Sequence, residues 1–213
     1  MPMLTTALRA IALLSLAAAP ASAAPAPAAA PLDTVVFGGG CFWGVQAVFQ
    51  HVTGVVSATS GYAGGTTRNP TYELVSDGNT GHAEVVRVVY DPAKVSLSKL
   101  YEVFFVVAHD PTQLNRQGPD RGTQYRSALY FTNDAQKTAA DAFVSELAKK
   151  GAYKGKIVTQ VAPLATFYTA EKYHQDYATL HPDQPYIVYN DAPKIADLKA
   201  RYPSLWQDKL AAH

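Results

Sequence analysis

The sequence contains a single cysteine, Cys41, in 213 residues. A disulfide bond within the chain is therefore excluded, and a hydrophobic core must supply the stability that cross-links provide in many small exported domains. An unpaired thiol forms a disulfide with another molecule, stays buried as a small hydrophobic group, or reacts. The composition alone leaves these three possibilities open for Cys41.

Methionine is almost as scarce, because the only two, Met1 and Met3, stand at the N-terminus. Residues 1–23 have the pattern of a secretory signal peptide: one charge at Arg9, an apolar run, and a small-residue cleavage pattern that ends at Ala23. We expect cleavage near Ala23 and export, in a bacterium to the periplasm. A leader that is kept as a membrane anchor is the alternative interpretation.

An excess of either charge is also absent. Without Arg9, the rest of the chain has 17 basic and 17 acidic residues, and the basic ones form no cluster. This balance argues against nucleic acid or an anionic membrane surface as a partner. After the leader, no apolar run is long enough to span a bilayer. We therefore expect no nucleic-acid partner and no membrane association, and we expect a monomer.

Two boundaries divide the chain. Residues 24–33 are rich in proline and alanine and are typical of a linker. Residues 34–213 should form one folded domain, because about 180 residues can bury a substantial core.

Strands and helices intermingle in the predicted domain without a strict alternation. Patterns of hydrophobic residues predict strands at 34–37, 55–60, 82–90, 125–131 and 158–167. They predict helices at about 41–54, 96–109, 134–150 and 171–180, with a short helix or turn at 71–75. The last thirty residues show no strong period. We therefore expect an α+β fold, a two-layer sandwich around a mixed β-sheet with a ferredoxin-like core and an extended C-terminal coil.

The stretch GGGCFWG, residues 38–44, joins the first predicted strand to the first predicted helix. Glycines allow a sharp turn there, and Cys41 falls at the helix start, where free N–H groups and the helix dipole favour a thiolate. Phe42 and Trp43 add an apolar surface beside the sulfur. A reactive cysteine is one interpretation; a buried hydrophobic residue or a phosphate-binding turn are the others.

Glu84 lies in the clearest predicted strand, residues 82–90. Alternate residues of a strand share a face, so Glu84 accompanies Val86 and Val88, whereas Arg87 lies on the opposite face, which we expect to reach solvent. A carboxyl on the buried face tends to be protonated near neutral pH and can donate its proton. Pairing with an arginine is the alternative.

Other chemistry is weakly represented. His174 with Asp176, or His109 with Asp110, could suggest a metal, but a second set of ligands at suitable spacing is missing. No phosphate-binding or dinucleotide-binding motif occurs. We therefore expect neither a metal nor a bound cofactor.

Four motifs, read together, carry a resemblance to a known family. They are GGGCFWG at 38–44, TGHAEVVRVVYDP at 80–92, RGTQYRSALY at 121–130 and EKYHQDY at 171–177. In this order and spacing the chain resembles the peptide methionine sulfoxide reductases of the A type, from Val35 to about Tyr189. The resemblance implies that residues 34–213 are a catalytic domain. It also implies reduction of L-methionine S-sulfoxide, free or in oxidised proteins, and hence protein repair.

The resemblance implies that four residues take part in the reaction at the substrate sulfur. Cys41 resembles the nucleophile that becomes a sulfenic acid. Phe42 and Trp43 resemble the cradle for the substrate methyl group. Glu84 resembles the proton donor, in agreement with its predicted burial.

Three further assignments depend on the resemblance alone. Tyr72 and Tyr125 resemble the residues that donate hydroxyl hydrogen bonds to the sulfoxide oxygen, and Asp120 resembles a supporting acid. The chain departs from many family members because it has no second, resolving cysteine. We therefore expect an external reductant: a thioredoxin-like or glutaredoxin-like thiol–disulfide donor protein, or a small thiol.

Two other functions stay open at this point. Cys41 could pair with His82, His109 or His174 in a hydrolase or acyltransferase, although the known cysteine-protease signatures are absent. The chain could also be a binding module that holds oxidised or apolar peptides in an aromatic groove without catalysis.

Overall fold

The computed structural model describes residues 31–213. The expected signal peptide, residues 1–23, and most of the expected linker, residues 24–33, lie outside the described residues. The first strand begins at Asp33, one residue before the expected start of the domain. Within residues 31–213, no helix combines the length and the apolar character needed to cross a membrane.

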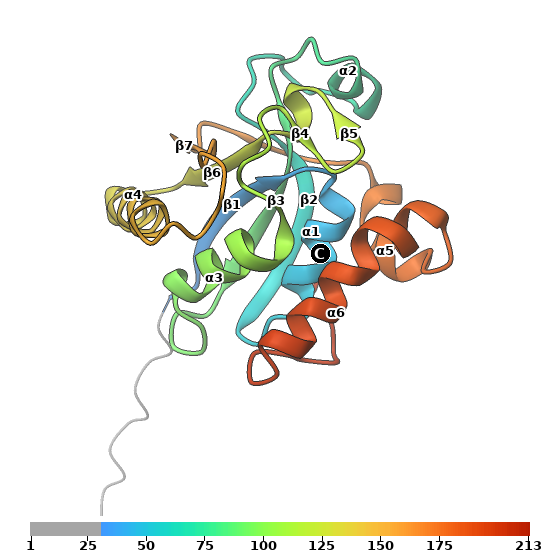
Figure 1. Cartoon of the computed structure of the whole chain (residues 1–213). Coiled ribbons are helices and arrows are strands. Elements are labelled where there is room, and N and C mark those ends of the chain that lie inside the picture. The colour runs from blue at the N-terminus through green and yellow to red at the C-terminus, as the bar shows by residue number, and fades with distance from the viewer. Residues whose placement is uncertain (1–30) are drawn as a thin grey trace, which may run out of the picture.

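The centre of the domain is a mixed β-sheet of six strands in the order β7-β6-β1-β3-β2-β8 (Figure 1). All neighbours are antiparallel except β6 and β7. A separate two-stranded hairpin, β4-β5, lies beside it. The strands are β1 (Asp33–Gly39), β2 (Val55–Ala63), β3 (Ala83–Tyr90), β4 (Arg116–Gln117), β5 (Asp120–Arg121), β6 (Ser127–Phe131), β7 (Gln160–Pro163) and β8 (Phe167–Thr169). The expected mixed α and β architecture around a mixed sheet is confirmed.

The helices occur between these strands and at the C-terminus. They are α1 (Phe42–Gln50), α2 (Tyr72–Ser76), α3 (Leu97–Val103), α4 (Asp134–Lys149), α5 (Tyr177–Leu180) and α6 (Ala192–Arg201). Two π-helical turns, η1 (Phe104–Ala108) and η4 (Ile187–Asp191), and two 3₁₀ turns, η2 (Thr123–Tyr125) and η3 (Lys172–His174), complete the list. The cap at Asn133, which accepts a hydrogen bond from the Gln136 N–H, confirms the predicted start of α4.

The main core lies between the sheet and helices α1 and α3. Phe37 of β1 stacks on Phe49 of α1, with 4.8 Å between ring centroids, and on Phe104 of η1 at 4.6 Å. Figure 1 shows α1 and α3 on the same side of the central strands. This packing fixes the start of α1 against the end of β1, which is where Cys41 lies.

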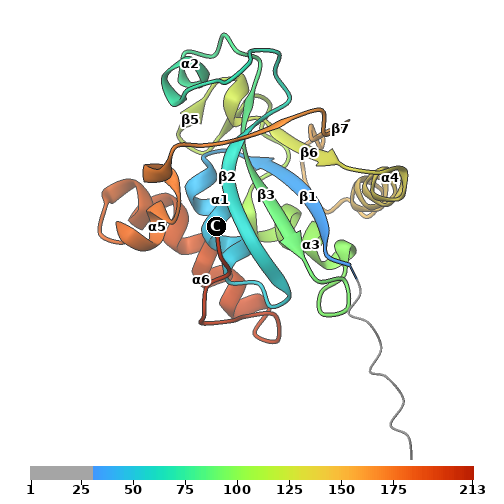
Figure 2. The same cartoon turned by 180° about the vertical axis from the view of Figure 1, so that it is seen from behind.

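The opposite face of the sheet is also covered, and this corrects an expectation. Val85 of β3 is buried on that face, and the guanidinium of Arg87 lies over the ring of Phe167, 4.5 Å from its centroid. Figure 2 shows the segment between β7 and β8 crossing this face. The face that carries Arg87 is therefore covered by the chain instead of open to solvent.

The expected long strand at 158–167 is in fact two short strands at opposite edges of the sheet. Six flat strands about 4.8 Å apart would separate the edges by roughly 24 Å, whereas the four steps from Pro163 to Phe167 span at most about 14 Å. The sheet must therefore curl until its edges approach each other.

The prediction of an extended coil at the C-terminus is wrong, because η4 and α6 are helical. After α6 the tail returns to the C-terminal end of α1. The Ala211 N–H donates to the Gln50 carbonyl at 3.0 Å, and the Gln207 N–H donates to the His51 carbonyl at 2.9 Å. The tail therefore holds the end of α1 that lies away from Cys41.

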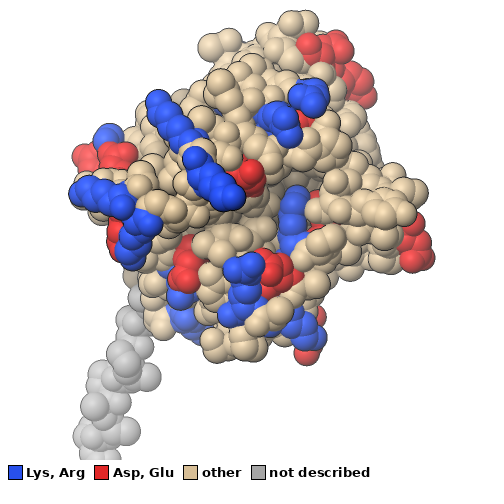
Figure 3. All heavy atoms as spheres, viewed as in Figure 1, with Lys and Arg blue, Asp and Glu red and all other residues tan. Residues whose placement is uncertain are grey.

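The surface matches the balanced composition. In Figure 3, Lys and Arg side chains are interspersed with Asp and Glu over a mostly uncharged face, and no broad area of one sign is visible there.

Candidate active site

The turn between β1 and α1 places Cys41 and depends on glycine. Gly40 has φ of +87°, a left-handed conformation that other residues adopt at a cost. A Cβ on Gly40 would also lie 2.4 Å from the Cβ of Gln117. Cys41 follows as the N-cap residue of α1, one position before its first helical residue, Phe42. The prediction of a cysteine at the helix start is confirmed.

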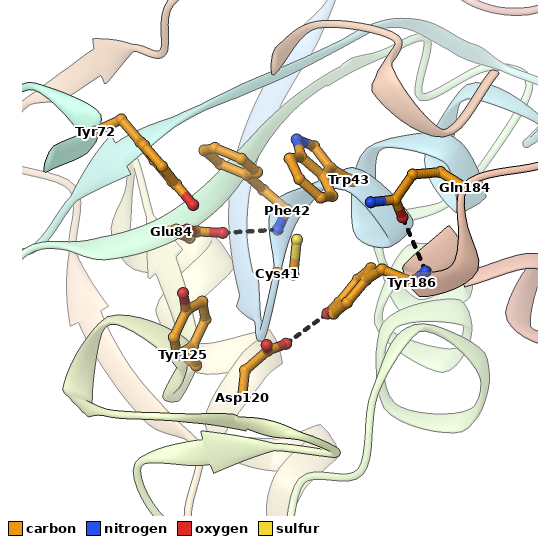
Figure 4. A pocket seen from close by; sticks show the side chains of 9 residues that line it. All are labelled: Cys41, Phe42, Trp43, Tyr72, Glu84, Asp120, Tyr125, Gln184 and Tyr186. Atoms are coloured by element: carbon orange, nitrogen blue, oxygen red, sulfur yellow. Dashed lines mark hydrogen bonds between the residues drawn. The ribbon is translucent and has the colours of Figure 1, made fainter. Parts of the chain in front are cut away.

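A cavity of about 230 Å³ opens beside Cys41. It brings together all seven residues that the sequence singled out, from four separate parts of the chain (Figure 4). Its lining residues are Cys41, Phe42, Trp43, Tyr72, Glu84, Asp120, Tyr125, Gln184 and Tyr186. Gln184 and Tyr186 were not predicted, because they lie in a part of the chain where no hydrophobic period marks an element.

Cys41 is 9% exposed, and its resting form is a thiol. Burial raises the pKa of the Cys41 thiol well above its ordinary value, the Glu84 and Asp191 carboxylates add to this, and the Trp43 N–H opposes it. The expectation of a resting thiolate is therefore wrong. Desolvation and nearby carboxylates outweigh the N–H groups at the start of α1.

Glu84 projects from β3 toward the start of α1. It is 2% exposed, and its Oε2 accepts a hydrogen bond from the Phe42 N–H at 3.1 Å. Burial raises the pKa of the Glu84 carboxyl to about 8, although the Phe42 N–H lowers it. Among the described residues it makes no ion pair, so the alternative of an arginine partner is wrong. Glu84 is mostly protonated at neutral pH.

Tyr72 and Tyr125 approach Glu84 from two other elements. Figure 4 shows both hydroxyls pointing toward the Glu84 carboxyl, Tyr72 from α2 and Tyr125 from η2. Burial raises the pKa of both phenols, so both remain hydrogen-bond donors. Tyr125 was expected in a strand, but β6 begins at Ser127. The 3₁₀ turn η2 directs Tyr125 into the cavity instead of onto a sheet face.

Asp120 lies at the start of β5, across the cavity from Glu84. The Tyr186 hydroxyl donates a hydrogen bond of 2.5 Å to its Oδ2. Burial raises the pKa of Asp120, although this hydrogen bond and Lys194 both lower it. The pair closes one side of the cavity next to the Cys41 sulfur.

The aromatic wall is held from behind by residues of the EKYHQDY motif. The Trp43 indole stacks on Tyr177 at 3.8 Å between centroids, and its Nε1–H donates to His174 Nδ1 at 3.1 Å. Glu171 accepts from the Tyr62 hydroxyl at 2.8 Å and from the Tyr72 N–H at 2.9 Å. The motif therefore positions Trp43 and Tyr72 without lining the cavity.

The histidine positions argue against a cysteine–histidine hydrolase. His82 is engaged by the Gly65 N–H and the Thr67 carbonyl, and His109 contacts the Phe104 carbonyl and Ser127 Oγ. His174 Nδ1 accepts from the Trp43 indole. None of these three rings lines the cavity at Cys41. In residues 31–213, no group of three or more His, Cys, Asp or Glu side chains is arranged to hold a metal ion.

Comparisons with known proteins agree on one family. Residues 33–205 match the family model described as peptide methionine sulfoxide reductase. The chain is 55% identical over 177 residues to peptide methionine sulfoxide reductase MsrA 2 of Mesorhizobium japonicum, covering 83% of this chain and 91% of the relative.

Two solved structures are similar in fold. Methionine sulfoxide reductase A of Corynebacterium diphtheriae superposes with a TM-score of 0.67 at 42% identity, covering 71% of this chain and 76% of that one. Reduced Mxr1 of Saccharomyces cerevisiae gives a TM-score of 0.66 at 36% identity, covering 74% and 89%.

Proposed function

The chain belongs to the peptide methionine sulfoxide reductase family, and we propose that the cavity at Cys41 is where it reduces the S epimer of methionine sulfoxide. The protein is a thiol-dependent oxidoreductase that acts on sulfur and repairs oxidised proteins. The observation that carries the proposed site is the shared cavity of a buried thiol and a buried carboxyl whose pKa is about 8.

The sulfoxide oxygen is a poor leaving group until it is protonated. Glu84 is mostly protonated at neutral pH and lies beside Cys41, so it can donate this proton. The hydroxyls of Tyr72 and Tyr125 face the same space and stabilise the oxygen by hydrogen bonds. These three groups bind the oxygen on one side of the Cys41 sulfur.

The chemical step conserves the neutral charge of the site. The Cys41 sulfur attacks the substrate sulfur while Glu84 gives its proton to the oxygen. The protonated oxygen then passes to the Cys41 sulfur as its bond to the substrate sulfur breaks, the bond between the two sulfurs breaks to release methionine, and the thiol proton returns to Glu84. The products are methionine and a Cys41 sulfenic acid, with substrate sulfur reduced and Cys41 oxidised by two electrons.

Phe42 and Trp43 form the apolar wall of the cavity and fit the S-methyl group of the substrate. Their position relative to the oxygen site would decide which epimer can place its methyl group and oxygen together. A binding module without catalysis would not require the buried acid next to the thiol, so catalysis is the better explanation of this arrangement.

The reductive half of the cycle needs a thiol from another molecule, because the sequence has no second cysteine. We propose a thioredoxin-like or glutaredoxin-like protein, or a small thiol, and no bound cofactor. We further propose a monomer that is exported to the periplasm after cleavage near Ala23, in which residues 34–213 form the catalytic domain.

We also propose that the centre of the fold is ferredoxin-like. The order β6-β1-β3-β2 is antiparallel throughout, and α1 and α3 follow β1 and β3 on one face. This order and these two crossovers support the proposal.

The test is turnover of each methionine sulfoxide epimer with dithiothreitol, comparing the wild type with Cys41→Ser. We expect the S epimer alone to be reduced, and only by the wild type. Equal activity on both epimers, or activity in Cys41→Ser, would contradict the proposed site.

A further inference from the structure

A second cavity, of about 140 Å³, also reaches Cys41 and is not used by the reaction proposed above. It is lined by Cys41, Gln117, Gly118, Pro119, Asp120, Tyr186, Tyr189, Asn190 and Lys194. The two cavities share Cys41, Asp120 and Tyr186. The hydrogen-bonded pair of Tyr186 and Asp120 therefore stands between them.

Apart from the three shared residues, the two cavities reach the sulfur past different side chains: Glu84, Tyr72 and Tyr125 line the first, and Gln117, Asn190 and Lys194 line the second. In Figure 4 the oxygen-binding groups Glu84 and Tyr72 lie on one side of the Cys41 sulfur, and Tyr186 lies on the other. The sulfenic oxygen, once formed, is held on the Glu84 side. A thiolate that displaces it must approach in line with the sulfur–oxygen bond that breaks, and so from the side opposite Glu84.

We propose that the second cavity is where the reducing thiol reaches the Cys41 sulfenic acid, and that it takes a short, unbranched thiol. This inference rests on the proposed function, because the sulfenic acid must form first. The volume equals that of roughly four or five water molecules, which suits a thiol with two or three carbons. Tyr189, which is 79% exposed, marks the outer rim.

The lining of the cavity offers an entering thiolate one positively charged side chain, set against the Asp120 carboxyl that lines the same cavity. Lys194 is the one cation among the described residues that line either cavity. Its ammonium pairs with the buried Asp191 at 3.1 Å, and the Lys194 side chain as a whole is 19% exposed. A nearby ammonium favours the thiolate form of an entering thiol, which is the form that attacks.

Reduction of the sulfenic acid takes two thiols. The entering thiolate forms a disulfide with Cys41 as the sulfur–oxygen bond breaks, and hydroxide leaves as water with the proton of Glu84. A second thiol then attacks the mixed disulfide, which releases the Cys41 thiolate and a small-molecule disulfide. A proton from the second thiol and one from the solvent restore Cys41 and Glu84. The entering thiols are oxidised and the sulfenic sulfur is reduced.

Two glycines allow a matched kinetic test. Gly118 lines the second cavity with φ of +55°, and Gly151, at the end of α4, has φ of +60°; a Cβ at either position meets no atom within 4 Å. We expect Gly118→Phe to slow reduction of the sulfenic acid by 2-mercaptoethanol about tenfold or more, the scale of an obstructed approach. Gly151→Phe should leave this rate unchanged. Equal rates in the two variants would overturn the proposal.

A second measurement uses the wild type and does not depend on folding of a variant. One equivalent of methionine sulfoxide and then limiting 2-mercaptoethanol would give the mixed disulfide for crystallography. We expect the hydroxyethyl group between Tyr186 and Lys194; a position against Glu84 and Tyr72 would overturn the proposal. If no methionine is released in the first step, the proposed function fails instead. A reduction rate with thioredoxin above that with 2-mercaptoethanol, at equal thiol concentration, would contradict the assignment to a small thiol.

Discussion

Replacing Glu84 with glutamine tests the proton donor most directly. The glutamine would keep the shape of the side chain, and its amide oxygen could still accept the Phe42 N–H, now 3.1 Å from Glu84 Oε2. What the substitution removes is the acidic proton. With a pKa of about 8, about nine-tenths of Glu84 is protonated at pH 7, whereas a solvent-exposed glutamate would be protonated in only roughly one molecule in 500. Burial thus supplies most of the donor population.

We expect Glu84→Gln to slow the formation of methionine by roughly 10²-fold or more, the usual range for general acid catalysis, while substrate binding changes little. The wild-type rate should fall as pH rises through about 8, since deprotonation removes the donor, and this fall should vanish in the variant. Rapid-quench measurement of the first methionine per enzyme separates this step from reduction by thiols. The control is Glu146→Gln, because Glu146 lies on α4 in an exposed ion pair with Lys150. Wild-type rates in Glu84→Gln would show that Glu84 is only structural.

Further predictions concern the thiol, the oxygen site and the packing of α1. Cys41→Ser should abolish reduction while the fold is kept, and near-UV circular dichroism with an activity assay checks both. Without reductant, the wild type should release one methionine per chain, with Cys41 then trapped by dimedone in mass spectrometry; two methionines per chain would refute the single-thiol cycle. Tyr125→Phe should lower the rate of methionine release about tenfold, the scale of one lost hydrogen bond to developing charge, with circular dichroism unchanged. Gly44→Ala should destabilise the protein by about 1–3 kcal/mol in urea unfolding, because the added Cβ would lie 2.1 Å from Asp191 Oδ1.

The sequence predicts those parts of the site whose positions are set by residues close together in the chain. The glycine turn places Cys41 at the start of α1, and alternation along β3 places Glu84 on the helix-covered face. Tyr125 was misplaced because a 3₁₀ turn ending in a tyrosine has the same hydrophobic pattern as the first residue of a strand. Only the resemblance to the family indicated that Tyr125 belongs to the site, because the hydrophobic periodicity did not.

Other features depend on tertiary contacts. Tyr186 reaches the cavity because η4 and α6 pack on α1, which no pattern near residue 186 indicates. For α6 itself a signal was present: Pro193 in the first turn, then Ile195 and Leu198 three residues apart. The raised pKa of the Cys41 thiol could not be read from the sequence, because Asp191 and Glu84 are brought to it only by folding.

The return of the C-terminal tail to the end of α1 has a consequence for how the protein is made. Gln50 Nε2 donates to the carbonyl of Ala211, which lies 161 positions further along the chain. Contacts between residues so far apart in the sequence form late, because closing the long loop between them costs conformational entropy before the contacts stabilise the fold. Helix α1 therefore reaches its final setting only when nearly the whole polypeptide is available. Until then Cys41 lacks its settled position beside Glu84 and Asp191, so the raised pKa of its thiol is a property of the completed fold.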